Sequence, residues 1–327
     1  MQKRIGVNVA AAVVAALVCL VTPEVRAQLA VWPARSVTIV VPFPAGGVVD
    51  LAARVFSQDF AKRFGQQFLV EPRPGGSYMV GMRIVKAAAA DGYTLMMHSN
   101  GINMVQSTLK NPGMDVRNDF AAITPAISSP QGVWINASLP ATTLKEFIDY
   151  ARQSPGKLNY GTTGIGGAVH LPTARMLNLV GLNVVHIPYA GGPPVMGALS
   201  AGDIHLLLWE VASLSRQNMG QLRLLALIGN ERSKLAPEVP TLRELGIDMA
   251  APFWLGFFAT GGTPQPVLAQ LNAGVRDALQ TPELVKYLNA QGWTPAWMSL
   301  DAARRLMVEE VEQWAQTVKS VGIALSD

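Results

Sequence analysis

Short runs of β-branched and apolar residues alternate with stretches of helical periodicity, and this alternation restricts the fold more than any other feature of the chain. Strands that alternate with helices form mostly parallel sheets, because each helix carries the chain back to the start of the next strand. The first series of strands is expected at 37–41, 67–71 and 94–97, with helices at 50–64 and 79–89. A second series has strands at 121–127, 132–135, 158–161, 184–187, 204–209 and 222–228. Its helices are expected to end at Arg152 and to span 168–180 and 195–201. Helices over 265–280, 282–290 and 300–321 complete an α/β chain.

Apolar residues at helical spacing indicate which faces of two helices are buried. In the first helix the expected core residues are Leu51, Val55, Phe56, Phe60 and Phe64. In the last helix they are Leu306, Val311, Trp314 and Val318. We interpret these aromatic residues as core and not as a ligand site.

A chain of 327 residues is longer than one typical hydrophobic core, which favours two domains. The sequence has no low-complexity linker, no block of like charges and no repeat of fixed period. Two domains without a visible linker suggest that the chain passes between them more than once.

The first residues resemble an export signal. Lys3 and Arg4 precede an apolar run over Ile5–Val21, Pro23 follows it, and small residues lead to Ala27. We expect a signal peptide over 1–27, cleavage near Ala27 and a periplasmic protein. An uncleaved membrane anchor is the alternative, since the apolar run is near the short limit for a spanning helix.

Cys19 is the only cysteine. It would make the protein a lipoprotein if it were acylated, but the large Val18 precedes it where a small residue is expected. Cleavage at Ala27 removes Cys19, which excludes thiol catalysis, disulfides and cysteine-bound metals from the mature chain. The formal net charge of +4 is too small to indicate a nucleic-acid-binding protein.

The stretch "VVPFPAGGVVD" joins a strand to the first turn of a helix through residues with little side chain. Unpaired N–H groups and the positive end of the helix dipole at such a turn suit a carboxylate or phosphate. The candidate ligand-binding residues here are Pro44, Ala45, Gly46 and Gly47. Asp50 is expected to cap the helix, and its charge argues against a highly charged phosphate. A tight turn that simply requires glycine is the competing interpretation.

The stretch "NYGTTGIGGAVHL" repeats this strand–turn–helix construction. Its candidate ligand-binding residues are Thr162, Thr163, Gly164, Ile165 and Gly166. The two glycines at Gly164 and Gly166 resemble part of a dinucleotide fingerprint, but Val169 stands where the third glycine belongs and no acidic residue ends the next strand. The threonine hydroxyls instead favour a small polar anion.

A third strand and turn occur in "VVHIPYAGGPPVMGAL". Tyr189 and Gly191 are candidates for the wall of a cleft, although a tyrosine at a strand end more often packs. His186 lies in an apolar strand and is expected to be a core histidine.

Catalytic and metal-binding motifs are scarce. Ser99 and Ser128 lack the Gly-x-Ser-x-Gly frame of a serine hydrolase. The four histidines, His98, His170, His186 and His205, lie on separate elements without the spacing of a helical zinc site. We expect no metal and no cofactor. An acid–base pair of His170 and His205 across a cleft is the one enzymatic alternative.

The segments "WPARSVTIVVPFPAGGVVDLAARV", "VEPRPGG", "ADGYTLMMHSNG", "NDFAAI", "KLNYGTTGIGGAVHL", "VVHIPYAGGPPVMGAL", "VPTLRELG" and "WLGFFATGGTPQPVLAQLN" occur in this order. Over nearly the whole mature chain, the sequence resembles the solute-binding receptors of tripartite tricarboxylate transporters, the Bug or TctC family.

The resemblance implies a type II periplasmic-binding-protein fold, with two α/β lobes and a ligand cleft between them. The lobes would be 28–128 together with 250–327, and 129–249. In such receptors, the turns that match 42–47 and 161–167 hold one carboxylate of a small organic acid from opposite lobes. The loop that matches 189–192 completes the wall.

Several positions depart from the family's pattern. Pro72 replaces a common asparagine, and a glycine- and asparagine-rich turn becomes Ser77, Tyr78 and Met79, near the expected distal end of the ligand. His205 stands where aspartate is common. These changes suggest an aromatic or less polar acid, although His205 is equally consistent with a structural role within its lobe.

The favoured function is a monomeric periplasmic receptor that captures a small carboxylate and delivers it to membrane permease subunits. A ligand-bound signalling partner of a sensor kinase is an alternative. A small-acid hydrolase or isomerase using His170 and His205 is another.

Overall fold

The computed structural model describes residues 32–217 and 220–322. The chain divides into two units, Met1–Arg35 and Ser36–Asp327, and every element below belongs to the second. The expected signal peptide over 1–27 lies outside the described residues.

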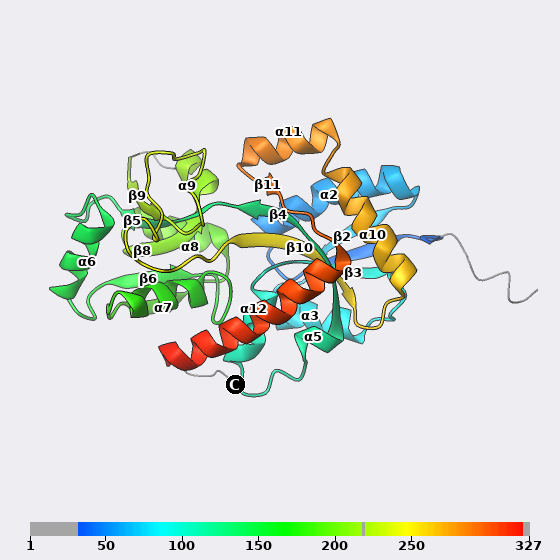
Figure 1. Cartoon of the computed structure of the whole chain (residues 1–327), viewed down its shortest axis with the longest axis horizontal. Helices are drawn as coiled ribbons and strands as arrows, with labels where there is room; N and C mark the ends of the chain where they lie inside the picture. The colour runs from blue at the N-terminus through cyan, green and yellow to red at the C-terminus, as the bar shows by residue number, and fades with distance from the viewer. Residues whose placement is uncertain (1–31, 218–219, 323–327) are drawn as a thin grey trace, which may run out of the picture. The chain divides into compact units, whose positions relative to one another are not determined.

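The first sheet has the strand order β11-β4-β10-β3-β1-β2 (Figure 1). Its strands are β1 (Val37–Val41), β2 (Phe68–Pro72), β3 (Thr94–Ser99), β4 (Phe120–Ser129), β10 (Phe253–Thr260) and β11 (Thr294–Pro295). Strands β1, β2 and β3 are parallel, whereas β10 is antiparallel to both β3 and β4. We call this sheet and the helices packed on it the first lobe.

The second sheet has the order β7-β6-β8-β5-β9. Its strands are β5 (Gln131–Asn136), β6 (Asn159–Thr162), β7 (Val185–Pro188), β8 (Leu206–Glu210) and β9 (Leu222–Leu227). Strand β6 is parallel to β7 and β8, and β5 is antiparallel to β8 and β9. We call this sheet and its helices the second lobe.

The longer helices of the first lobe are α2 (Val48–Phe64), α3 (Met79–Ala87), α10 (Gln265–Ala278), α11 (Pro282–Gln291) and α12 (Leu300–Val321). Those of the second lobe are α6 (Leu144–Arg152), α7 (His170–Leu179), α8 (Gly192–Ala201) and α9 (Val211–Gln217). Shorter segments are α4 (Ile102–Val105), η2 (Gln106–Thr108) and α5 (Val116–Asp119). Helix α6 begins with a capping box, in which Thr143 and Glu146 each accept a hydrogen bond from the other's backbone N–H.

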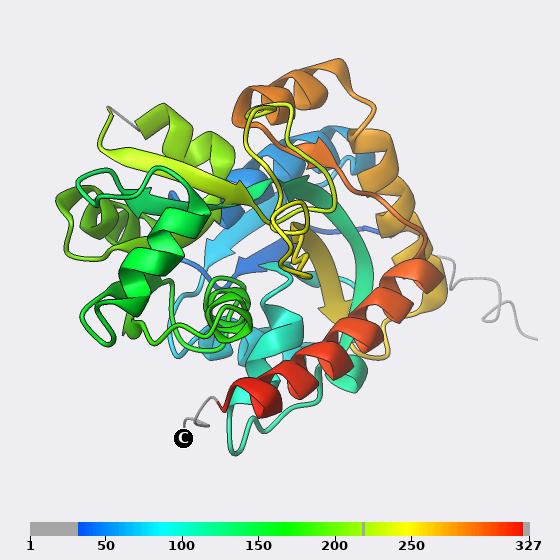
Figure 2. The same ribbon diagram turned by 60° about the vertical axis from the view of Figure 1, so that its left-hand side comes forward.

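The chain crosses between the two sheets twice. Only Pro130 separates β4 from β5, and the chain returns between Leu227 and Phe253 to form β10. Strands β4 and β10 pair along their length and lie side by side in Figures 1 and 2. This double crossing was expected from two domains without a linker.

The sheets are mixed and not mostly parallel, which corrects one expectation. Two strands were missed, the two-residue β11 and the central β10, whose sequence "FWLGFFAT" is apolar up to its last residue. A short continuous apolar run has neither strand nor helix periodicity, so the pattern alone did not identify this central strand.

Helix α2 begins two residues earlier than expected, and its buried face differs in part. Phe56 and Phe60 are fully buried and pack on Phe257 of β10, as expected of core aromatics. Leu51 is 41% exposed and Val55 is only half-buried. The small Ala52 and Ala53 are fully buried instead.

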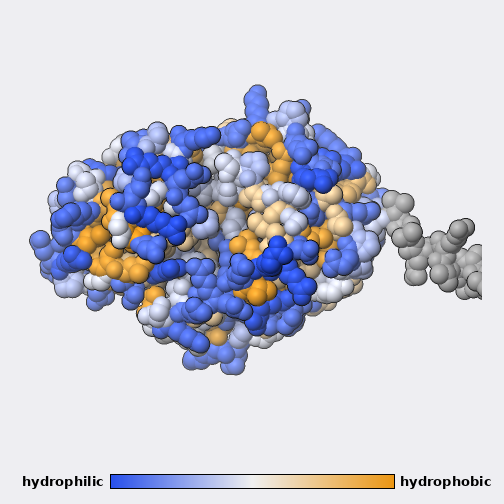
Figure 3. Space-filling model, in the orientation of Figure 1, coloured by the Kyte–Doolittle hydropathy of each residue, from blue (hydrophilic) through white to orange (hydrophobic). Residues whose placement is uncertain are grey.

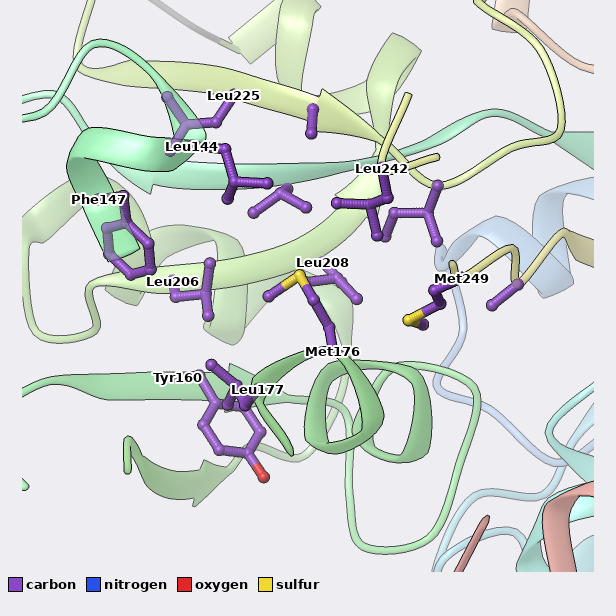
Figure 4. Close-up of a cluster of buried hydrophobic side chains, with 14 of the residues drawn as sticks. Leu144, Phe147, Tyr160, Met176, Leu177, Leu206, Leu208, Leu225, Leu242 and Met249 are labelled. Carbon is purple, nitrogen blue, oxygen red and sulfur yellow. The ribbon is translucent and has the colours of Figure 1, made fainter. Parts of the chain in front are cut away.

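Helix α12 joins the cores of both lobes. Met307 and Val311 belong to a cluster with first-lobe residues such as Met82 and Met96. Trp314 and Val318 belong to the second-lobe cluster, part of which is drawn in Figure 4 around Phe147 and Leu206 on α6 and β8. The end of α12 therefore packs on the second lobe, although 250–327 was assigned to the first.

Hydrophilic side chains cover much of the face in Figure 3, with apolar side chains in patches between them. Within the described residues, no helix combines the length and the apolar character that a membrane span requires.

Candidate functional site

A cavity of about 730 Å³ is lined by residues of both lobes. Volumes of this order are typical of small-molecule sites. The turn before α2 contributes Pro44, Gly46 and Gly47, and the turn after β6 contributes Thr163 and Gly164. The two turns singled out from the sequence thus meet at one cavity.

The cavity also receives the first residues of α2. Gly47 is the N-cap residue, and the first helical hydrogen bond is donated by Leu51 N–H to the Gly47 carbonyl oxygen at 3.0 Å. The N–H groups of Val48 and Val49 come before that bond and have no helical acceptor. Because both residues line the cavity, their amides are suited to an anion there.

Asp50 does not have the position expected of it. The helix begins before it, so Asp50 is the third helical residue and not the N-cap. Its Oδ2 accepts a hydrogen bond from Gly46 N–H at 2.9 Å, and Arg54 donates to both carboxylate oxygens. The amide of Gly46 is therefore bound within the chain, and Arg54 balances the charge of Asp50.

Internal hydrogen bonds fix the second turn. The Thr162 hydroxyl donates to the Gly164 carbonyl oxygen at 2.8 Å and lies 2.7 Å from His186 Nε2. Gly166 N–H donates to His170 Nδ1 at 3.0 Å. Thr162, Ile165 and Gly166 are not among the residues that line the cavity, whereas Ala168 and Val169, just before α7, are.

His170 and His186 support this turn as neutral rings. Their ring centroids are 4.0 Å apart in a stacked arrangement, and Tyr160 stacks on His186. Burial, followed by the neighbouring His186, lowers the pKa of His170 to about 3, and burial lowers the pKa of His186 to about 4. A neutral His170 can accept the Gly166 hydrogen bond, so it shapes the turn from behind the cavity.

His205 directly precedes β8 and lies at the end of the second sheet opposite to the cavity, where β6 and β8 begin. Its Nδ1 accepts a hydrogen bond from Asn159 N–H at 3.1 Å, and its own N–H donates to the Asn159 carbonyl oxygen. His205 therefore stands where β6 and β8 begin, whereas Thr163 and Gly164 follow the end of β6. The structure does not place His205 among the residues that line the cavity, nor does it pair His205 with His170.

Ser77 and Tyr78 line the cavity, but Met79 does not. Tyr78 has φ 77° and Ser77 has φ 49°, a left-handed backbone that is uncommon outside glycine. The Tyr78 ring packs against Phe43 and His98 with centroids 4.8 and 5.0 Å apart. Its hydroxyl lies 3.4 Å from Thr163 Oγ1 in the second lobe. Met79 is buried in the first-lobe core.

Tyr189 and Gly191 also line the cavity, whereas the exposed Ala45 does not. Gly191 has φ 147°, and a Cβ there would lie 3.2 Å from Pro44 Cγ. The loop after β7 therefore approaches the turn before α2 closely, and the two loops form one wall.

Several lining residues were missed from the sequence. They are Val48, Val49, Leu51, Pro74, Gly75, Gly76, Ser99, Gln131, Ala168, Val169, Pro193, Met196, Trp209, Glu210, Ser213, Arg216, Phe253, Gln291 and Trp293. Many follow or end strands at the edge where ligands of α/β sheets bind, a signal that could have indicated Ser99 and Glu210.

Glu210 has an altered acidity. Burial raises its pKa to about 7, although the positive charge of Arg216 and hydrogen bonds with Ser213 and Trp293 act in the opposite direction. Within residues 32–217 and 220–322, no group of three or more His, Cys, Asp or Glu side chains is placed to hold a metal ion.

Comparisons with known proteins agree with this architecture. Residues 52–323 match the model of the tripartite tricarboxylate transporter family receptor, TctC. The chain is 30% identical to Protein BugT of Bordetella pertussis, over 90% of this chain and 91% of that protein. The structure of R. palustris Rpa4515 with adipate superimposes with a TM-score of 0.83 at 30% identity, covering 90% of this chain and 99% of the other.

MatC from Rhodopseudomonas palustris with bound malate gives a TM-score of 0.80 at 27% identity, covering 88% of this chain and all of that one. The similarity to these solved structures supports the expected type II periplasmic-binding-protein fold with two α/β lobes. The chain belongs to the TctC, or Bug, family of periplasmic solute-binding receptors.

Proposed function

We propose that this protein captures a small organic carboxylate in the periplasm and delivers it, unchanged, to the permease subunits of a tripartite tricarboxylate-type transporter. The signal peptide would be removed near Ala27, and the mature receptor would act as a monomer. The lobes that close on the ligand would be 28–128 with 250–327, and 129–249.

One observation carries the proposal: the N-terminal turns of α2 and α7, one from each lobe, line the same cavity. Amides at helix N-termini are suited to a carboxylate, and a ligand that contacts both lobes binds the closed form more tightly than the open form. We propose that one carboxylate lies between Val48 and Val49 on one side and Thr163, Gly164 and Ala168 on the other.

The size and lining of the cavity support an acid with a substantial apolar body. The side chains of Phe43, Tyr78, Met196 and Trp209 line it together with few charged groups. The adipate in the R. palustris Rpa4515 structure and the malate in MatC support the carboxylate class. We propose that this receptor takes a larger or less polar acid than malate.

The test is the identity and affinity of the ligand. Mass spectrometry of what co-purifies with the protein should detect a carboxylic acid. Calorimetry with mono- and dicarboxylates, aromatic ones included, should give a dissociation constant in the micromolar range or below for at least one. Failure of every acid to bind, or recovery of a chemically converted product after incubation, would overturn the proposal.

A further inference from the structure

Glu210 is a buried acid at the end of the cavity where the two lobes are connected. It is the last residue of β8, is only 3% exposed and lines the cavity. It pairs in the sheet with Gln131, the first residue after the crossing at Pro130. Phe253, where the chain returns to the first lobe, also lines the cavity.

One oxygen of this carboxylate has no partner. Among the described residues, Oε1 of Glu210 is buried and makes no hydrogen bond. Arg216 is the nearest candidate to neutralise it, but its guanidinium donates to the Ala290 carbonyl oxygen and to Gln291 Oε1, at 3.3 and 3.1 Å. An unpaired buried acceptor is costly, so a native protein that retains one usually has a use for it.

Glu210 is close to the proposed carboxylate site. Strands β6 and β8 are parallel, with Tyr160 opposite Leu206, so the turn at Gly164 is level with Glu210. Neighbouring strands are about 4.8 Å apart. If the carboxylate of the ligand is held at Gly164 and the ligand extends toward β5, the rest of the ligand therefore lies beside Glu210.

The two ends of such a ligand meet opposite environments. Helix N-termini favour a negative group at one end, whereas Glu210, once ionised above its pKa of about 7, repels a second carboxylate and attracts a donor to its unpaired Oε1 at the other. We propose that Glu210 is a specificity-determining residue that selects monocarboxylates with an ammonium or hydroxyl group distal to the carboxylate and disfavours dicarboxylates. This inference rests on the proposed function as a carboxylate receptor.

The test compares four acids with the same six-carbon chain and different distal groups: caproate, ε-aminocaproate, ε-hydroxycaproate and adipate. Calorimetry on the full-length mature protein at about pH 8.5, where Glu210 is ionised, should show that ε-aminocaproate and ε-hydroxycaproate bind at least tenfold more tightly than adipate. In Glu210→Gln, which keeps the shape of the side chain, the preference for ε-aminocaproate over adipate should fall at least tenfold.

The matched control is Glu238→Gln, an exposed acid of the second lobe, which should leave all four affinities unchanged. Caproate reports on the carboxylate site alone, so its affinity should be similar in wild type and Glu210→Gln. The inference is overturned if adipate binds the wild type as tightly as the amino and hydroxy acids, or if Glu210→Gln leaves their ratio unchanged. If none of the four acids binds the wild type at millimolar concentration, this inference is overturned, whereas the carboxylate receptor is refuted only if the wider set of mono- and dicarboxylates, aromatic ones included, also fails to bind.

Discussion

The Oδ2 atom of Asp50 lies 2.9 Å from the backbone nitrogen of Gly46, so a residue inside α2 fixes the turn that precedes the helix. Asp50 is 1% exposed, and Arg54 donates to both of its carboxylate oxygens. The protein thus keeps an acid beside the turn proposed to bind an anion, because hydrogen bonds within the chain hold its carboxylate. The shape of the turn depends on this side chain.

Replacing Asp50 with alanine should destabilise the fold and loosen the turn. The change leaves Gly46 N–H and the Arg54 guanidinium without their acceptor, which typically costs about 1–3 kcal/mol. Urea unfolding should show a lower midpoint with an unchanged slope, and calorimetry should show weaker carboxylate binding. Asp149→Ala removes an exposed pair with Lys145 and should change neither.

Valine at Gly46 or Gly164 should reduce affinity through the backbone. A Cβ at Gly46 would meet nothing within 4 Å, and at Gly164 only Ser77 Oγ at 3.7 Å, so crowding is not the reason. The φ angles of 77° and 129° are the obstacle, because a β-branched residue there costs about 1–3 kcal/mol or forces the turn to rearrange. We expect a folded protein by circular dichroism with at least tenfold weaker binding.

Gly156→Val is the matched control for this pair. Gly156 has φ 72°, has open space around it and lies in the turn between α6 and β6, so it carries the same strain at a distance from the cavity. Its valine variant should lose similar stability and keep full affinity. Equal loss of binding in all three variants would show that strain in general, and not these turns, controls affinity.

The sequence identified two turns that line the cavity and missed lining residues whose place depends on the tertiary arrangement of the strands. The turns at Gly46 and Gly164 are visible because a strand, glycines and a helix follow one another. Phe253 reaches the cavity because the chain returns to the first lobe there, and β10 was not recognised as a strand. Glu210 reaches it as the last residue of β8, a strand whose end was not read as part of the site. His205 is not among the lining residues, because it directly precedes β8 and so lies at the opposite end of the sheet.

Alanine at Gly167 should oppose closure of the lobes. Its Cβ would lie 2.4 Å from the Tyr78 hydroxyl oxygen, which belongs to the other lobe. We expect weaker ligand binding with little change in stability, measured by calorimetry and thermal unfolding. Tyr78→Phe alone should have a small effect, since the contact of its hydroxyl with Thr163 is long, at 3.4 Å.

The double variant Gly167→Ala/Tyr78→Phe tests this contact directly. Removing the hydroxyl relieves the closest approach, so the double variant should bind more tightly than Gly167→Ala, and the two effects should not add. Strict additivity would mean that Gly167 and Tyr78 act on binding separately.

Glu310 should make stability depend on pH. It lies on α12 where the cores of both lobes adjoin, and it accepts hydrogen bonds from Asn103 Nδ2 at 2.7 Å and Trp254 Nε1 at 3.0 Å. Burial raises its pKa to about 7, against these two hydrogen bonds, which favour the charged form. The folded state therefore binds a proton more tightly than the unfolded state, whose glutamates have a pKa of about 4.3.

This difference between the folded and unfolded pKa of Glu310 determines how the free energy of unfolding changes with pH. The stabilising effect of the bound proton is complete below about pH 4.3 and is lost as the pH rises through about 7, on the order of 2 kcal/mol between pH 5 and pH 8. Glu310→Gln lacks this effect, while the other titrating groups remain the same in both proteins. The free energy of unfolding of the wild type, minus that of Glu310→Gln, should therefore be larger at pH 5 than at pH 8 in urea titrations. Glu309→Gln, an exposed neighbour on α12, should show no such change, and a constant difference for Glu310→Gln across this range would contradict the prediction.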